Sequence, residues 1–410
     1  MDISLMVALV IVLALFFDFT NGFHDTANAM ATPIATGALK PRVAVAIAAV
    51  LNLVGAFLST EVARTISGGL IREGAGGIQI TPTMIFAGLI GAIMWNLATW
   101  LLGLPSSSSH ALFGGLIGAV IVGTGFGAID PSVLMTKIVL PAILAPFIAA
   151  IVAFVVTKIA YGITAGPKAD QARKRFKYGQ VFTSSLVSLA HGTNDAQKTM
   201  GIITLTLIAG GFQASGTGPE FWVIAVCALA IALGTYMGGW RIIKTIGTAI
   251  TDIAPPQGFA AEASTTATIL ASSHLGFALS TTQVASGSVI GAGLGKNRRG
   301  VRWRVAGRIA LAWLVTLPAA AVMAAVAELV ARLGPWGIAA DAVVGAAVIV
   351  LMFRRSRRNP VNHKNVASEI SVHSAHTPTM SMPNAPPSIS NKSARHSPVP
   401  APRANERNVH

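Results

Sequence analysis

The chain has 410 residues, of which 53% are hydrophobic and only 11% are charged, and its net charge is +15 at pH 7. Soluble globular proteins carry about 25% charged residues, so this composition excludes an ordinary soluble enzyme. Residues 354–410 hold nine basic and two acidic residues, so much of the positive charge lies in a terminal segment and does not indicate nucleic-acid binding. The composition predicts a protein that crosses a membrane many times.

Long apolar stretches recur along the chain. A membrane-spanning helix needs about 20 mostly apolar residues. Nine stretches approach or exceed this length: 3–18, 43–58, 84–102, 134–159, 181–210, 221–239, 245–272, 305–330 and 336–353. Two more, 106–126 and 280–294, are rich in Gly and Ser, which favours re-entrant or broken helices. We therefore predict an all-α polytopic membrane protein with about 10–12 transmembrane segments.

Basic residues between these stretches indicate the orientation. Clusters at 168–177, 296–304 and 354–358 are expected on the cytoplasmic side, which requires the first span to run inward.

The single cysteine, Cys227, excludes a disulfide framework. Residues 354–410 are rich in Ser, Pro, Asn and His, and this composition predicts a disordered, basic cytoplasmic tail.

The most informative pattern is an internal repeat. Residues 22–25 (GFHD) match residues 192–195 (GTND), and residues 107–110 (SSSH) match residues 280–283 (STTQ) in the same order. The repeat predicts two halves, 1–165 and 181–353, joined by a basic cytoplasmic loop at 166–180. Because the predicted orientation makes the halves inverted, the pattern is typical of transporters that work by alternating access.

Two carboxylates, Asp25 and Asp195, lie within these repeated apolar segments. An ionisable residue at membrane depth is costly and is therefore a candidate functional residue. We expect Gly22 and Gly192 to break their helices and to expose backbone carbonyls. Carboxylate and carbonyl oxygens suit a small cation, and carboxylates also carry protons.

The Ser/Thr runs predict a second kind of site. Residues 104–110 (LPSSSSH) and 279–283 (LSTTQ) each precede a Gly-rich apolar helix. Hydroxyl groups and backbone N–H groups at the start of a helix bind anions without help from Arg or Lys. Two copies in inverted halves therefore predict a shared oxyanion site, for phosphate or sulfate.

These motifs resemble the inorganic phosphate transporter (Pit) family, and the similarity covers residues 1–353. The resemblance implies two re-entrant hairpins and uptake of phosphate driven by a cation gradient. By position, it implies that phosphate is held by Ser107, Ser108, Ser109, Ser280, Thr281, Thr282 and Gln283. It further implies cation coupling through Asp25, Asn28, Asn194 and Asp195, with Glu262 as another functional acid.

Three positions differ from the family pattern and bear on the coupling ion. His24 lies in GFHD, at the place where sodium-coupled members have a sequence similar to GAND. Lys198 takes the place that Asn28 has in the first half, and Gln283 takes the place where many members have His. A titratable His beside Asp25 and a fixed ammonium near Asp195 favour proton symport, as in the bacterial low-affinity branch. His24 and Lys198 could instead only pair with the two aspartates.

Several alternatives remain open on the sequence. The same fold could carry sulfate, use sodium, or move phosphate as a neutral metal–phosphate complex. An intramembrane hydrolase using a serine of the 106–109 run with His110 is disfavoured because adjacent residues face apart on a helix, and a passive channel fits an inverted repeat poorly. We expect no enzyme activity, no cofactor, no dedicated metal site and no nucleic-acid partner. We expect a multi-pass protein of the bacterial plasma membrane; small-residue helices leave a homodimer open.

Overall fold

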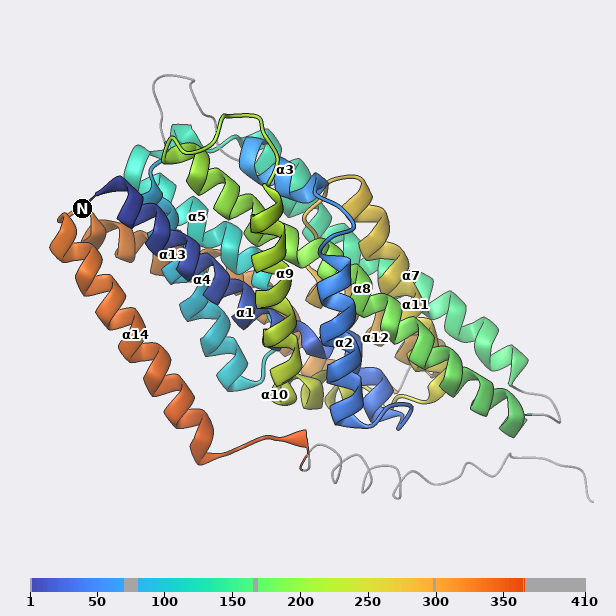
Figure 1. Ribbon diagram of the computed structural model, residues 1–410. Coiled ribbons are helices and arrows are strands. Elements are labelled where there is room, and N and C mark those ends of the chain that lie inside the picture. Colours follow the sequence, from blue (N-terminus) through green and yellow to red (C-terminus); the bar gives the residue numbers. More distant parts are fainter. Residues whose placement is uncertain (1, 70–79, 165–168, 298–299, 364, 366–410) are drawn as a thin grey trace, which may run out of the picture.

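The computed structural model describes residues 2–69, 80–164, 169–297, 300–363 and 365, and almost all of them are helical. The only strand-like pairing among them is a single bridge between Thr251 and Val301. Figure 1 shows the helices, whose bounds are α1 (Ile3–Ala35), α2 (Pro41–Gly55), α3 (Glu61–Gly69), α4 (Pro82–Leu102), α5 (Ser108–Thr124), α6 (Pro131–Val133), α7 (Leu140–Ile163), α8 (Ala169–Ala209), α9 (Phe221–Met237), α10 (Trp240–Lys244), α11 (Pro255–His274), α12 (Thr281–Lys296), α13 (Trp303–Ala331) and α14 (Pro335–Arg358). The predicted all-α fold is confirmed.

Five of the described helices are long and apolar enough to cross a membrane, and the bent pair of α9 and the segment Trp240–Ala249 raises the number to six. The helices outside this group are short or rich in polar residues; α8 carries the GTND motif and α11 carries Glu262. A helix buried inside a membrane protein can be polar, because its neighbours supply hydrogen-bond partners. The count of ten to twelve crossings therefore stays a prediction.

The helices of the repeated GFHD and GTND motifs are continuous, so the expected breaks at Gly22 and Gly192 are wrong. α1 runs unbroken for 33 residues and α8 for 41. The two glycines instead allow close helix contact. A Cβ on Gly22 would collide with the carbonyl oxygen of Ile231 in α9, and one on Gly192 would collide with the carbonyl oxygen of Asn52 in α2.

The packing of the last helices also follows the repeat, and it crosses between the predicted halves. Gly114 and Gly118 of α5 lie against the backbone of α13, at Leu317 and Ala321. Gly287 and Gly291 of α12 lie in the same way against α7, at positions 146 and 150. Each Gly-rich helix therefore packs on a long apolar helix of the other half, α5 on α13 and α12 on α7. This symmetry supports the predicted division into two halves, whose boundaries stay a prediction.

α5 and α12 begin at the two Ser/Thr runs. At 1.5 Å per residue they are about 26 Å and 24 Å long, shorter than the roughly 30 Å hydrocarbon core of a bilayer. The Ser107 hydroxyl caps α5 by accepting from the backbone N–H of His110, and the Ser280 hydroxyl caps α12 by accepting from that of Gln283. Their length and their polar starts agree with the expected re-entrant segments.

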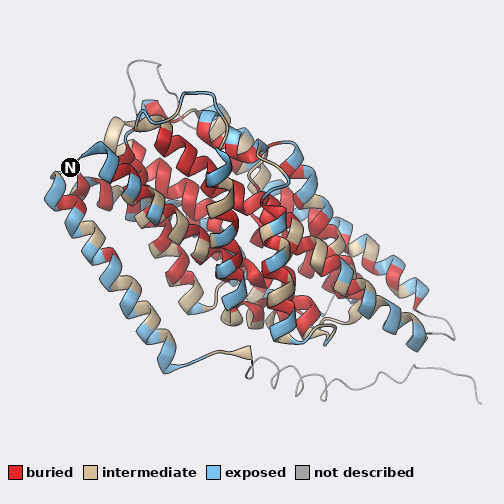
Figure 2. Cartoon of the chain, in the orientation of Figure 1, coloured by how far each residue is buried: buried red, intermediate tan, exposed pale blue. Residues whose placement is uncertain are grey.

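The connecting segments differ from expectation in two places. Residues 169–180 of the predicted basic loop are the first turns of α8, which project with the end of α7 beyond the rest of the molecule (Figure 1). Residues 354–358 of the predicted tail are helical and complete α14, which runs along one flank and is largely exposed (Figure 2). Most of the predicted disordered tail lies outside the described residues.

Candidate functional site

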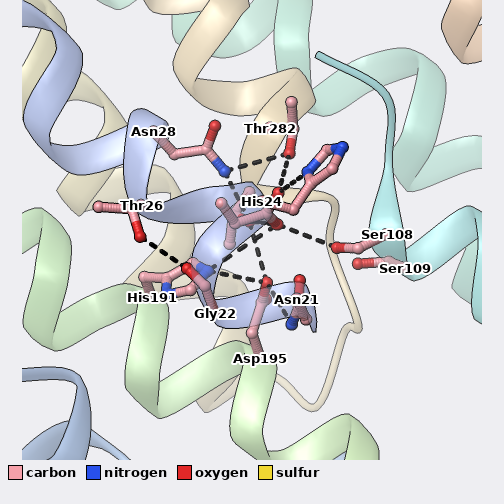
Figure 3. Close-up of polar contacts among 12 residues, drawn as sticks. Asn21, Gly22, His24, Thr26, Asn28, Ser108, Ser109, His191, Asp195 and Thr282 are labelled. Carbon is pink, nitrogen blue, oxygen red and sulfur yellow. Dashed lines mark hydrogen bonds and ion pairs between the residues drawn. The ribbon is translucent and has the colours of Figure 1, made fainter. Parts of the chain in front are cut away.

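α1 and α8 bring Asp25 and Asp195 together in the centre of the molecule, where each side chain is at most 1% exposed. Figure 3 shows Asp195 near polar side chains from α1, α8 and the starts of α5 and α12, among them Asn21, Ser108 and Thr282. The hydroxyl of Thr281 links them, lying 3.3 Å from Asp25 Oδ2 and 3.1 Å from Asp195 Oδ2. The two copies of the acidic motif therefore form one site.

The hydroxyls at the helix starts donate to these carboxylates. Ser108 Oγ lies 2.9 Å from Asp25 Oδ2, and Thr282 Oγ1 lies 3.1 Å from Asp25 Oδ1. The side-chain amide of Asn28 donates to Thr281 and Thr282 at 3.3 Å and 3.1 Å. The groups predicted to hold an anion and the groups predicted to hold a cation are thus in direct contact.

His24 pairs with its neighbour Asp25. Its Nδ1 lies 2.6 Å from Asp25 Oδ1, and its Nε2 lies 3.4 Å from the hydroxyl of Ser106. Ser106 in turn is 2.7 Å from the hydroxyl of Thr99 in α4. The ring of His24 therefore connects the central carboxylate to the first residue of the SSSSH run, and it sits where a proton could move to or from Asp25.

Lys198 is the buried cation of the site. Its Nζ lies 2.5 Å from Asp195 Oδ1, 2.6 Å from Ser109 Oγ and 2.9 Å from the carbonyl oxygen of Leu279. All three hydrogens of the ammonium have partners, which is what a buried charge needs in order to be tolerated. Because Ser109 lies in the first turn of α5 and Leu279 lies just before α12, Lys198 links both helix starts to α8.

His191 also lies in the central site, although it is not among the site residues predicted from the sequence. Its Nε2 lies 3.1 Å from Asp195 Oδ2 and 3.9 Å from Asp25 Oδ2, and its Nδ1 is 3.1 Å from the side-chain oxygen of Asn52. Asp25, His191 and Asp195 each offer a ligand atom within 4.8 Å of the others, so a cation could be held among them. The signal in the sequence was the repeat itself, since His191 occupies the position of Asn21, which also contacts Asp195.

Other predicted site residues lie outside this central cluster. Glu262 is buried and belongs to a separate cluster. Its carboxyl group accepts hydrogen bonds from Thr32, Gln180 and Thr183 at 2.5, 3.1 and 2.6 Å. Asn194 donates to Ser273, at 3.0 Å. Ser107 and Ser280 cap their helices, as described above.

Gln283 contacts its own counterpart in the repeat. Its side-chain nitrogen lies 3.3 Å from Nδ1 of His110, so the equivalent residues of α5 and α12 meet across the centre of the molecule. The ring of His110 therefore joins the two helix starts. Among the described residues its hydrogen-bond partner is the amide of Gln283, whereas a nucleophilic mechanism would pair the ring with a serine hydroxyl.

Comparison with known proteins identifies the family. The model of the phosphate transporter family matches residues 21–324, so the chain belongs to that family. A "Probable low-affinity inorganic phosphate transporter" of Mycobacterium tuberculosis is 52% identical over 376 residues, which cover 90% of this chain and 88% of the relative. One of the same name from Bacillus subtilis is 43% identical over 328 residues, covering 80% of this chain and 98% of the relative.

A solved structure shares the fold. "The sodium-dependent phosphate transporter" superposes with a TM-score of 0.71 at 24% identity, covering 80% of this chain and 99% of that chain. The predicted family is therefore confirmed. The chain is a transporter and not an enzyme, and it is a multi-pass protein of the plasma membrane, as the sequence predicted.

Proposed function

We propose that this protein imports inorganic phosphate by proton symport through alternating access. The observation that carries the proposal is the contact of Thr281 with both Asp25 and Asp195. The names of the relatives and the family model support phosphate as the substrate.

The shared hydroxyls supply a physical reason for coupling. Ser108, Thr281 and Thr282 donate to carboxyl oxygens here, and the same O–H groups are the donors expected to hold an oxyanion. A hydroxyl has one hydrogen and cannot donate to both. When a proton neutralises Asp25 or Asp195, that carboxyl accepts less strongly and the hydroxyls can turn to phosphate. Proton binding and phosphate binding then favour each other, which is the requirement for symport.

Two buried groups favour a proton over sodium. His24 lies 2.6 Å from Asp25 and can exchange a proton with it. The ammonium of Lys198 lies 2.5 Å from Asp195 and fills the space on that side with a positive charge belonging to the protein. A sodium ion placed there would be repelled. Phosphate, unlike sulfate, carries a proton near neutral pH and can donate to a carboxylate, so the same site favours phosphate over sulfate.

The test is uptake of labelled phosphate into liposomes that contain the purified protein, under an inward proton gradient without sodium. Asp25→Asn and Asp195→Asn serve as variants, excess sulfate serves as a competitor, and parallel assays add sodium or Mg²⁺. We expect uptake that follows the proton gradient, is lost in both variants and is unaffected by sulfate. Uptake that requires sodium would contradict proton coupling, and uptake that requires Mg²⁺ would indicate a metal–phosphate complex as the transported species.

A further inference from the structure

Asp18 is a buried acid that the mechanism above does not use. It lies in α1 near the middle of the helix, two turns before Asp25, and its side chain has no exposed surface. Neither carboxyl oxygen has a hydrogen-bond partner of ordinary geometry among the described residues. The polar side chain that faces it is the hydroxyl of Thr199 in α8, which also lacks such a partner. A carboxylate in this position is costly when ionised and is tolerated more easily when it holds a proton.

The internal repeat does not account for Asp18. At the offset that aligns Asp25 with Asp195, Asp18 aligns with Ser188, which donates to the carbonyl oxygen of Ser184 within its own helix. The second half therefore manages without a carboxyl group at this position. A residue required only for packing between helices would not need to be ionisable.

The titratable groups near enough to Asp18 for their charges to act on it belong to the central site and to α9. They are Asp195, His191 and Lys198 in α8 and Cys227 in α9. While Asp195 is ionised, its negative charge offsets the ammonium of Lys198 and disfavours a second negative charge on Asp18. Once Asp195 takes up a proton, the ammonium of Lys198 is left to favour ionisation of Asp18. The charge states of the two acids therefore oppose each other, and a proton on one favours its absence from the other.

We propose that Asp18 is a proton relay that delivers the coupling proton to Asp195. Asn21 lies one turn further along α1 and donates to Asp195 at 3.4 Å, while its own side-chain oxygen has no partner among the described residues. Asp18 and Asn21 are three residues apart and share one face of α1, and Asp195 and Thr199 are four residues apart and share one face of α8. In the relay, the carboxyl of Asp18 gives up its proton, the carboxylate of Asp195 accepts it, and Asp18 is reloaded from the side of higher proton concentration. This inference rests on proton symport as proposed above.

The test compares two assays on Asp18→Asn, whose amide has the shape of the protonated acid. Exchange of labelled for unlabelled phosphate at equal pH on both sides requires no net proton delivery, whereas uptake under a proton gradient does. We expect exchange to stay near the wild-type rate and proton-driven uptake to fall at least about tenfold. Asp18→Glu keeps a carboxyl and should recover part of the driven rate. Asp341→Asn, in α14 beside Glu328 rather than the central residues, is the matched control and should change neither assay.

The outcomes separate the two proposals. If wild-type protein shows no proton-driven uptake, proton symport fails and the relay fails with it. If wild-type uptake is proton-driven and Asp18→Asn equals wild type in both assays, only the relay is overturned, and Asp18 serves packing. A drop of one in the number of protons moved per phosphate would also overturn it, because a relay changes the rate and not the stoichiometry. Should Asp18→Asn lose exchange as well, Thr199→Val decides: selective slowing of driven uptake supports the relay, and a wild-type rate overturns it.

Discussion

At the scale of single residues, the site depends on which hydroxyls bind and which only build the helix starts. Ser108 donates to Asp25, while Ser107 accepts from the backbone of α5. We expect Ser108→Ala to raise the KM for phosphate roughly tenfold or more, since a hydrogen bond to a charged group is worth about 1.5–3 kcal/mol. Ser107→Ala should instead lower the stability by about 1 kcal/mol through loss of the cap. Uptake kinetics and thermal unfolding of the two variants in detergent measure these effects; an equal rise in KM for both would mean that the cap residue also binds substrate.

Lys198 offers a test of the coupling ion. Its counterpart in the first half is Asn28, an uncharged residue that contacts the Thr281 and Thr282 hydroxyls. Replacing Lys198 by Asn removes the ammonium beside Asp195 and leaves that carboxylate without a positively charged partner. A sodium ion can then take this position. We expect Lys198→Asn to gain uptake stimulated by sodium and to lose much of its proton-driven uptake. The measurement is uptake across a sodium series, with Lys198→Arg as the variant that keeps the charge. Sodium stimulation in Lys198→Arg, or none in Lys198→Asn, would contradict the role given to the ammonium.

Residue types and spacing were enough to predict the two aspartates and the two Ser/Thr runs, because the repeat doubled each signal. They did not predict the contacts among them. His191 was not among the predicted site residues, since a lone His in an apolar segment is usually a satisfied core residue. Only the packing of the helices shows its Nε2 to lie 3.1 Å from Asp195 Oδ2. Glu262 matched the family pattern, yet the fold places it in a separate cluster with Thr32 and Thr183.

At the scale of helices, the glycines of the acidic motifs act through packing. The sequence cannot distinguish a Gly that ends a helix from one that lets a neighbouring backbone approach, because the absence of a Cβ serves both purposes. Here Gly22 faces the carbonyl oxygen of Ile231, and Gly234 of α9 faces that of Phe19 in return. The contact between α1 and α9 is therefore made by backbones that touch, and it holds Asp25 at a fixed position.

This packing gives a prediction at three glycines. Gly22→Ala and Gly192→Ala place a methyl group against backbone atoms and should destabilise the protein by about 1–3 kcal/mol each. Gly307→Ala, in the exposed part of α13, meets no atom within 4 Å and should be neutral or slightly stabilising, by up to about 1 kcal/mol. Thermal unfolding in detergent compares the three variants. Unchanged stability of Gly22→Ala would argue that α1 and α9 can move apart at no cost.

At the scale of the whole molecule, the crossed packing makes the halves interdependent. α5 contacts α13 and α12 contacts α7 through glycines that lie on the partner's backbone. A chain cut between residues 164 and 169 should therefore yield two fragments that are unstable when expressed separately. We expect co-expression of the two fragments to restore folded protein and phosphate uptake. Size-exclusion chromatography of each fragment and of the pair measures this; a first fragment that is stable alone would contradict the interdependence.

The crossed packing also means that α5 is synthesised well before α13, the helix on which it packs. Once residues 108–124 have been synthesised, about 180 more residues must be added before the first turn of α13, at Trp303, exists. At 5–20 residues per second, this takes roughly 10 to 40 s. Over that interval a short, Gly-rich helix with buried hydroxyls waits in the membrane without its final neighbour. A cell that makes this protein must shelter that helix from proteases, and mutations that lengthen the wait should reduce the yield of transporter without changing the behaviour of each finished molecule.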